Sequence, residues 1–317
     1  MRDLQTCVRS HRPSAAQFCG QECLAGAGQR DKNRTIPVLK LPFLGVETLE
    51  QERALSMALY DHPAVKDDLA RWNATLLMPT PMPQYNLVGL GDEPRSLEGF
   101  DGMSVRATGG IGEAMEAVGA VPTSMSATEV RQAMDSGVVK AVGFAPHAHM
   151  AFGTIENGQW WTENLNPGTV NCPVVANTDA LDMLSDDHRE ALLGSIDEAL
   201  DYYIDNYENN TLEAWGPALE ARSLEVIRFD EESIQNFEAS VAGSAAEAWV
   251  ENMGDRGIPA QELYDFATGT LADLKSGSRS KRQRPVAYDM RRVISFTTTG
   301  RRPGCPGRPQ SCRMTVC

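Results

Sequence analysis

Residues 102–146 read GMSVRATGGIGEAMEAVGAVPTSMSATEVRQAMDSGVVKAVGFAP, and this stretch decides the fold. Its short apolar runs, separated by glycine turns and amphipathic segments, predict strands that alternate with helices. The predicted strands are residues 103–108, 121–125 and 138–145, and the predicted helices are residues 111–118 and 127–136. A β-α-β-α-β unit normally builds a parallel sheet with crossover helices, so an α/β fold is expected.

Arg106 stands near the end of the first predicted strand, just before a turn that contains Gly109, Gly110 and Gly112. In open α/β sheets, ligands bind at this edge, where strands end and helices begin. Arg106 is therefore a candidate ligand-binding residue. The alternative is a solvated arginine at a strand end.

Three pieces of this stretch carry a family resemblance: Val105-Arg106 at a strand end, GAVPTSM at residues 119–125 and GVVKA at residues 137–141. In this order and spacing they resemble the solute-binding proteins of TRAP (tripartite ATP-independent periplasmic) transporters, of the C4-dicarboxylate-receptor type. The resemblance extends from about Asp31 to Lys275. The third piece departs from the family pattern, which carries aspartate where this chain has Lys140.

The resemblance implies a two-lobed fold like that of periplasmic binding proteins, with residues 35–275 forming two discontinuous α/β lobes. A long helix is expected to span both lobes, from residue 187 to about residue 207 and on towards Leu219. Residues 1–34 show no counterpart of the family's secretory signal or of its first strands and helices. The first lobe is therefore expected to be incomplete.

The implied function is that of a periplasmic receptor that binds a small organic acid and delivers it to the membrane components of a TRAP transporter. The resemblance implies no catalysis and no cofactor. It implies that Arg106 holds the ligand carboxylate through two hydrogen bonds, which the closing lobes shield from water. The alternative is a truncated, non-binding product or a protein-interaction remnant, because missing strands would expose a sheet edge.

Further candidate ligand residues lie on strands expected to line the cleft. Asn86 stands where sialic-acid-type receptors place a second arginine, and its amide offers hydrogen bonds without charge. Phe144 either stacks on the ligand or belongs to the core. His147 either bonds the ligand, as a donor or pH-sensitive latch, or is an ordinary loop histidine. The remaining candidates are Gln84, Tyr85 and Asn171.

Composition favours a folded globular protein, with 42% hydrophobic and 23% charged residues. No apolar run approaches the roughly 20 residues of a membrane helix. Residues 276–317 hold ten Lys/Arg and one acid, and residues 1–34 hold six and three, so the total of −14 leaves −26 on residues 35–275. A body this acidic disfavours nucleic acid as a partner.

The two ends differ from the body in character and hold six of the seven cysteines. Residues 1–34 are predicted to be a disordered or out-of-frame leader without a signal peptide, and residues 276–317 a disordered basic tail. The alternative for the tail is nucleic-acid binding. Cys19-x-x-x-Cys23 has zinc-like spacing, but no second ligand pair follows, so no metal site is predicted.

Motifs of catalysis are missing from the sequence. Residues 109–112 read GGIG, which does not satisfy Gly-x-Gly-x-x-Gly, and there is neither a Walker loop nor a Gly-x-Ser-x-Gly elbow. A Cys-dependent enzyme, with Cys172 activated by His147 or His149, is the weaker alternative. Pro173 and the strand setting favour a packed thiol instead.

Periodicity also predicts elements outside the central stretch. Strands are expected at residues 38–44, 75–78, 85–88, 169–177 and 226–229. Helices are expected at residues 48–60, 64–72, 147–156, 178–184, 231–253 and 259–274. Trp160 and Trp161 are expected to pack from a polar loop.

Overall fold

The computed structural model describes residues 34–280, with side chains up to residue 277. The predictions for the leader, for most of the basic tail and for the Cys19–Cys23 spacing lie outside these residues. Within the described part, no helix is both long enough and apolar enough to cross a membrane.

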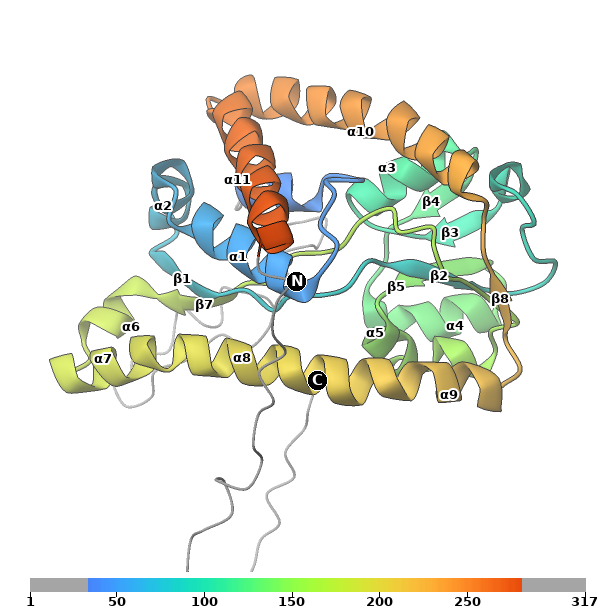
Figure 1. The fold of residues 1–317 in the computed structure, drawn as a ribbon, viewed down its shortest axis with the longest axis horizontal. Coiled ribbons are helices and arrows are strands. Elements are labelled where there is room, and N and C mark those ends of the chain that lie inside the picture. The colour runs from blue at the N-terminus through green and yellow to red at the C-terminus, as the bar shows by residue number, and fades with distance from the viewer. Residues whose placement is uncertain (1–33, 281–317) are drawn as a thin grey trace, which may run out of the picture. The chain divides into compact units, whose positions relative to one another are not determined.

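A six-stranded sheet forms the larger part of the structure, with strand order β4-β3-β5-β2-β6-β8 (Figure 1). β3 pairs in parallel with β4 and β5, β2 is antiparallel to β5 and β6, and β6 is parallel to β8. The strands are β2 (Asn86–Gly89), β3 (Ser104–Arg106), β4 (Val121–Thr123), β5 (Ala141–Phe144), β6 (Trp160–Thr162) and β8 (Glu225–Ile227).

The predicted β-α-β-α-β unit is confirmed. α3 (Gly110–Ala117) connects β3 to β4, and a 3₁₀ turn followed by α4 (Val130–Asp135) connects β4 to β5. Gly110 must lack a side chain, because a Cβ there would lie 2.3 Å from the carbonyl oxygen of Lys40. This close approach seats the segment around Lys40 against the start of α3, at the edge where Arg106 ends its strand.

The smaller sheet pairs β1 (Ala74–Met78) with β7 (Val174–Asn177) in antiparallel fashion. It lies beside a layer of helices that share one apolar cluster, which includes Leu55, Val65, Ala246 and Leu263. These helices are α1 (Leu49–Tyr60), α2 (Pro63–Ala70), α10 (Glu231–Gly254) and α11 (Ala260–Ser280). The six-stranded sheet has a separate apolar cluster, which includes Leu87, Val105, Ile111 and Val142.

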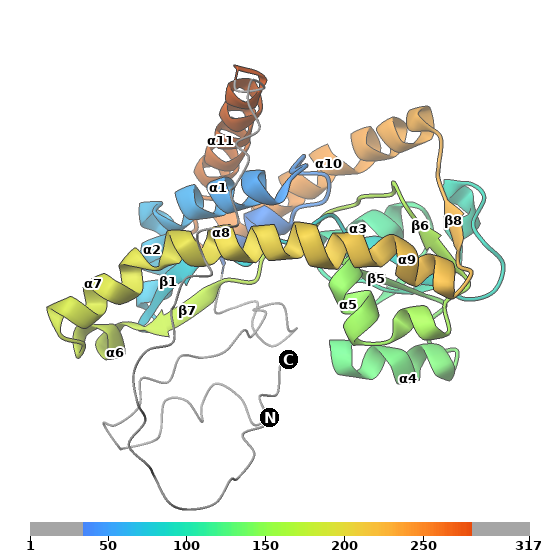
Figure 2. The ribbon, with the colours of Figure 1, turned by 60° about the horizontal axis from the view of Figure 1, so that its bottom comes forward.

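A long helical segment runs past both sheets, as the sequence predicted (Figures 1 and 2). It consists of α7 (Asp186–Gly194), α8 (Ile196–Asn206), a π-helical turn (Tyr207–Leu212) and α9 (Glu213–Ala221). α8 contacts β1 and α1, while the π-turn contacts α5 (Pro146–Ala151) beside the larger sheet. α10 also joins the two apolar clusters, through Phe237 in one and Ala246 in the other.

The predicted strand at residues 38–44 is wrong. A 3₁₀ helix (Ile36–Lys40), with Pro37 in its first turn, occupies residues 38–40, and the rest of the segment is a turn without strand pairing. The proline ring fixes φ near the helical value and removes an N–H that a sheet would need. The buried apolar residues Val38 and Leu39 therefore belong to a short helix rather than to a strand.

The predicted polar loop around Trp160 and Trp161 is also wrong, because both residues lie in β6. Trp160 pairs with Gly89 and Trp161 with Val88 of β2. Trp160 is only 1% exposed, which confirms its packing role. Gly89 leaves room for the indole: a Cβ there would lie 2.0 Å from the Trp160 ring.

We expect Gly89→Ala to destabilise the protein by about 2–3 kcal/mol, because the added methyl group overlaps the Trp160 ring and the sheet must shift. Urea unfolding followed by tryptophan fluorescence measures the change. Gly243→Ala in α10 is the matched control, since its Cβ meets nothing within 4 Å. The control should leave stability within about 1 kcal/mol or raise it. Equal effects of the two variants would contradict this packing.

Candidate functional site

Arg106 lies at the end of β3 with 7% of its surface exposed. Its Nη1 donates to the carbonyl oxygen of Gly143 and its Nη2 to that of Met125, both at 3.2 Å. The guanidinium carbon lies 4.4 Å from the centre of the Phe144 ring. β5 thus supplies one carbonyl group and the ring, and the segment just after β4 supplies the other carbonyl group, that fix the orientation of Arg106.

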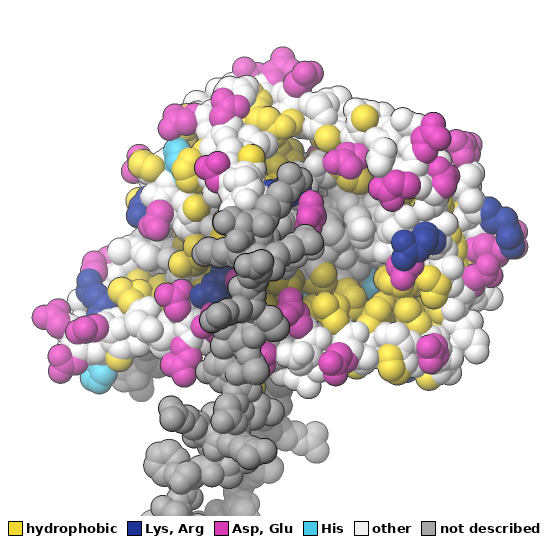
Figure 3. Space-filling view, in the orientation of Figure 1, with side chains coloured by type: hydrophobic (Ala, Val, Ile, Leu, Met, Phe, Trp, Pro, Cys, Tyr) yellow, Lys and Arg dark blue, Asp and Glu magenta, His cyan; other side chains and the backbone are white. Residues whose placement is uncertain are grey.

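The charge of Arg106 is not neutralised within the part of the chain that the structure describes. It contacts no carboxylate there, and its Nε is buried without a hydrogen-bond partner. Burial lowers its pKa, opposed only by the influence of Tyr85. Exposed arginines such as Arg53 and Arg222 do pair with acids, and the visible surface carries many acids (Figure 3). Arg106 is thus a buried cation that meets no carboxylate among residues 34–277.

Gln84 and Tyr85 precede β2. Tyr85 is 6% exposed, and its hydroxyl donates to the Met82 sulfur at 3.7 Å. Burial raises the pKa of Tyr85, and the charge of Arg106 acts against this shift. Gln84 donates from Nε2 to the carbonyl oxygen of Val46 at 2.7 Å, while its buried Oε1 has no partner. Tyr85 is therefore, with Phe144, a predicted residue that lies close to Arg106.

Glu52 is a member of the site that the sequence did not reveal. It is 3% exposed on α1, and its Oε2 accepts a hydrogen bond of 2.7 Å from the Met82 N–H. Its buried Oε1 makes no hydrogen bond. Burial raises the pKa of this carboxyl to about 8, against smaller lowering effects from the Met82 N–H and the Asn171 amide.

Glu52, Ser56 and Tyr60 are spaced four residues apart, so they share one face of α1. The predicted ligand residue Asn171 binds this face. Its Oδ1 accepts from the Tyr60 hydroxyl at 2.7 Å and its Nδ2 donates to Ser56 Oγ at 2.9 Å. The signal in the sequence was this polar row on a helix whose other inward residues are apolar.

Asn86 uses its amide within the protein. Its Oδ1 accepts from the N–H of Leu165 at 3.0 Å, the N–H of Asn166 at 3.3 Å and the Thr162 hydroxyl at 3.2 Å. Its Nδ2 donates to Asn166 Oδ1 at 2.8 Å. In this conformation Asn86 holds the loop that follows β6, and its ligand role stays a prediction.

His147 joins α5 to the long helix. Its Nδ1 lies 2.6 Å from the hydroxyl of Tyr207, which begins the π-turn, and burial lowers its pKa. His149 points elsewhere: its ring bonds Thr154 and the Asn86 carbonyl, and burial lowers its pKa to about 3. His149 is therefore a neutral structural residue, whereas His147 packs edge-on against Tyr207, whose ring contacts Tyr203.

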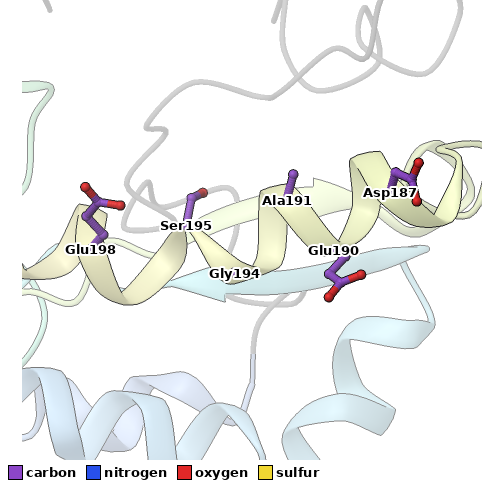
Figure 4. A pocket seen from close by; sticks show the side chains of 6 residues that line it. All are labelled: Asp187, Glu190, Ala191, Gly194, Ser195 and Glu198. Atoms are coloured by element: carbon purple, nitrogen blue, oxygen red, sulfur yellow. The ribbon is translucent and has the colours of Figure 1, made fainter.

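A separate hollow lies on the long helix, between Asp187 and Glu198 (Figure 4). Its described lining includes Asp187, Glu190 and Glu198 and no Lys, Arg or His. In Figure 4 the carboxylates of Glu190 and Glu198 point to opposite sides of the helix. Such a surface repels organic anions and provides no convergent set of ligands, so the site around Arg106 is the better candidate.

We expect Glu52→Gln to become more stable relative to wild type as pH rises. A carboxyl whose pKa is raised on folding contributes its stability below about pH 4.5 and loses it as pH rises through about 8. The difference in unfolding free energy should grow by up to about 1.4 kcal/mol per pH unit within that window. Urea unfolding at several pH values measures it.

Glu50→Gln is the control for this experiment, because Glu50 is an exposed carboxyl on the same helix. We expect its stability difference from wild type to stay constant from about pH 5 to about pH 8. A constant difference for Glu52→Gln as well would show that Glu52 ionises normally.

Comparison with known proteins gives a consistent picture. The family model for "bacterial extracellular solute-binding protein, family 7" (DctP) matches residues 24–252. No curated protein matches the chain. Solved structures that match include a TRAP solute-binding protein from Rhodoferax ferrireducens T118 in complex with copurified benzoate. It has 15% identity and a TM-score of 0.69, over 80% of this chain and 79% of that chain.

Two further solved structures resemble the chain. A marine metagenome TRAP protein in complex with 3-hydroxybenzoate has 17% identity and a TM-score of 0.66, over 78% of each chain. A Bordetella bronchiseptica TRAP periplasmic protein with bound (R)- and (S)-mandelate has 18% identity and a TM-score of 0.64, over 79% of each chain. At these identities the likeness establishes the fold.

Proposed function

The chain belongs to family 7 of the bacterial extracellular solute-binding proteins, the receptors of TRAP transporters, and we propose that it binds a small organic acid in the periplasm. The receptor would deliver this acid to the membrane components of its transporter. The family consists of solute-binding proteins and not of enzymes, so the Cys-dependent enzyme is set aside.

The observation that carries the proposal is the buried, unneutralised guanidinium of Arg106. A buried charge without a partner is costly, and a carboxylate with matching geometry removes that cost. Arginine has five N–H groups, and the carbonyl oxygens of Gly143 and Met125 use two of them. The Nε–H and two Nη hydrogens remain, which is enough for a two-pronged pair with a carboxylate.

The ligands named for the three relatives support this chemical class. Benzoate, 3-hydroxybenzoate and mandelate each carry one carboxylate. In this chain Phe144 covers one face of Arg106, and Tyr85 lies beside it. An acid with a flat or apolar body would pack against these rings while its carboxylate meets the guanidinium.

We assign residues 35–275 to the receptor body and its two largest apolar clusters to two lobes. The long helix and α10 pass from one cluster to the other, so they would hold the lobes together during closure. Closure around the acid would exclude water from the Arg106 pair and strengthen it. Of the predicted site residues, Phe144, Tyr85 and His147 would take part in the cleft.

We expect Arg106→Ala to weaken binding of the best carboxylate ligand at least about 100-fold, because a buried charged hydrogen-bonded pair is lost. Isothermal titration measures this after a thermal-shift screen with benzoate, 3-hydroxybenzoate, mandelate and succinate. Arg95→Ala is the control, since Arg95 is an exposed arginine paired with Glu93. It should bind as wild type does.

Two results would contradict the proposal. One is a stabilising acid whose affinity Arg106→Ala leaves unchanged, which would place the carboxylate elsewhere. The other is a folded protein that none of a broad set of acids stabilises. That second result would favour the alternative of a non-binding remnant of the family.

A further inference from the structure

Glu52 carries a buried oxygen that the protein leaves without a partner. Its Oε2 is bonded to the Met82 N–H, whereas Oε1 is inaccessible to solvent and makes no hydrogen bond. Folded proteins satisfy almost all such atoms, so an exception calls for a reason. A ligand group that completes the hydrogen bonding is one such reason.

The groups that face Glu52 are polar but neutral. Tyr60 comes from its own helix, Tyr85 from the segment before β2, and Tyr203 and Tyr207 from the long helix. Burial raises the pKa of each phenol, so all four keep their protons at neutral pH.

No Lys or Arg pairs with Glu52 in the described part of the chain. His147, which bonds Tyr207, stays neutral because burial lowers its pKa. The carboxyl of Glu52 is therefore mostly protonated at pH 7, and it can donate a hydrogen bond as well as accept one.

Glu52 and Arg106 belong to the same polar site. Met82 links Glu52 to Tyr85, because its N–H donates to Glu52 Oε2 at 2.7 Å and its sulfur accepts from the Tyr85 hydroxyl at 3.7 Å. The Tyr85 phenol in turn lies near enough to Arg106 for the charge of Arg106 to act on its pKa. The site thus combines one fixed positive charge with one neutral acid on a different element. A ligand that satisfies both has one carboxylate and, away from it, an uncharged hydrogen-bonding group.

We infer that Glu52 is the second anchor of the bound acid, where its neutral carboxyl hydrogen-bonds a hydroxyl or carbonyl group distant from the carboxylate held by Arg106. This inference rests on the proposed receptor function and narrows its ligand class to hydroxy or oxo monocarboxylates. A second carboxylate on the ligand would find no cation at Glu52. It would also lie beside an acid that must stay protonated.

The test compares matched acids with and without a hydroxyl group. The pairs are benzoate with 3-hydroxybenzoate and 4-hydroxybenzoate, and hexanoate with 6-hydroxyhexanoate. Isothermal titration of the full chain should show that wild type prefers at least one hydroxylated member by about tenfold. Glu52→Gln should keep this preference, because its amide also donates. Glu52→Leu should lose the preference yet bind the unhydroxylated acid as wild type does.

The pH dependence is the second readout and does not require the leucine variant to fold. Wild-type affinity for the preferred hydroxy acid should fall about fourfold from about pH 6.5 to about pH 8.5, as Glu52 ionises. Glu52→Gln should show no such fall. Lys40 must be tested alongside, because burial lowers its pKa to about 8 as well. Lys40→Met should retain the fall, and Glu50→Gln should behave as wild type.

The possible outcomes distinguish a failure of the proposed receptor function from a failure of the proposed role of Glu52. If no acid binds in a manner that depends on Arg106, the receptor proposal fails and the role of Glu52 fails with it. If binding needs Arg106 but wild type shows no hydroxyl preference, or Glu52→Gln keeps the fall with pH, only the role of Glu52 is wrong. An affinity that rises with pH would also overturn it, since that result indicates a ligand group that binds the ionised form of Glu52 better than the neutral form.

Discussion

The central constraint in this protein is a buried guanidinium that no carboxylate of the described residues neutralises. Arg106 reaches its position because β3 is short, because glycines let α3 begin at once, and because β5 offers a carbonyl group and a phenyl ring. Each of these features places its own requirement on the backbone or on the side chains around Arg106. Together they keep a positive charge fixed while leaving some of its hydrogen-bond donors unused, and a solute carboxylate would complete the arrangement.

The sequence predicted the parts of the fold that depend on local pattern. The β-α-β-α-β unit was visible because its strands, glycine turns and helices follow one another within residues 102–146, and the long helix showed its period clearly. The segment at residues 38–44 was mistaken for a strand, since buried apolar residues look alike in a short 3₁₀ helix and Pro37 was given too little weight. Trp160 was placed in a loop because its pairing with Gly89 joins residues far apart in the chain.

The residues of the site were harder to predict than the fold, because their contacts also join segments that are far apart in the chain. Arg106 could be found from its strand end and its motif, but the use of Asn86 depends on a loop about eighty residues later, which competes for its amide. Glu52 was overlooked because a single acid on an amphipathic helix normally faces water. That acid faces inward because α1 packs against the segments around Met82 and Asn171. The spacing of residues along α1 shows which side chains share a face, but it does not show which segments pack against that face.

The π-turn in the long helix has a geometric consequence. In a regular α-helix each residue advances by about 100°, so the later inward side chains would drift around the axis relative to the earlier ones. The wider turn at Tyr207–Leu212 takes up the equivalent of about one extra residue and so delays this rotation. Leu200 and Ile204 before the turn, and Trp215 and Leu219 after it, can then lie along one continuous buried line. The π-turn thus keeps the buried side chains of α8 and α9 on the same side of the long helix, so that one helix can pack against both α1 and α5.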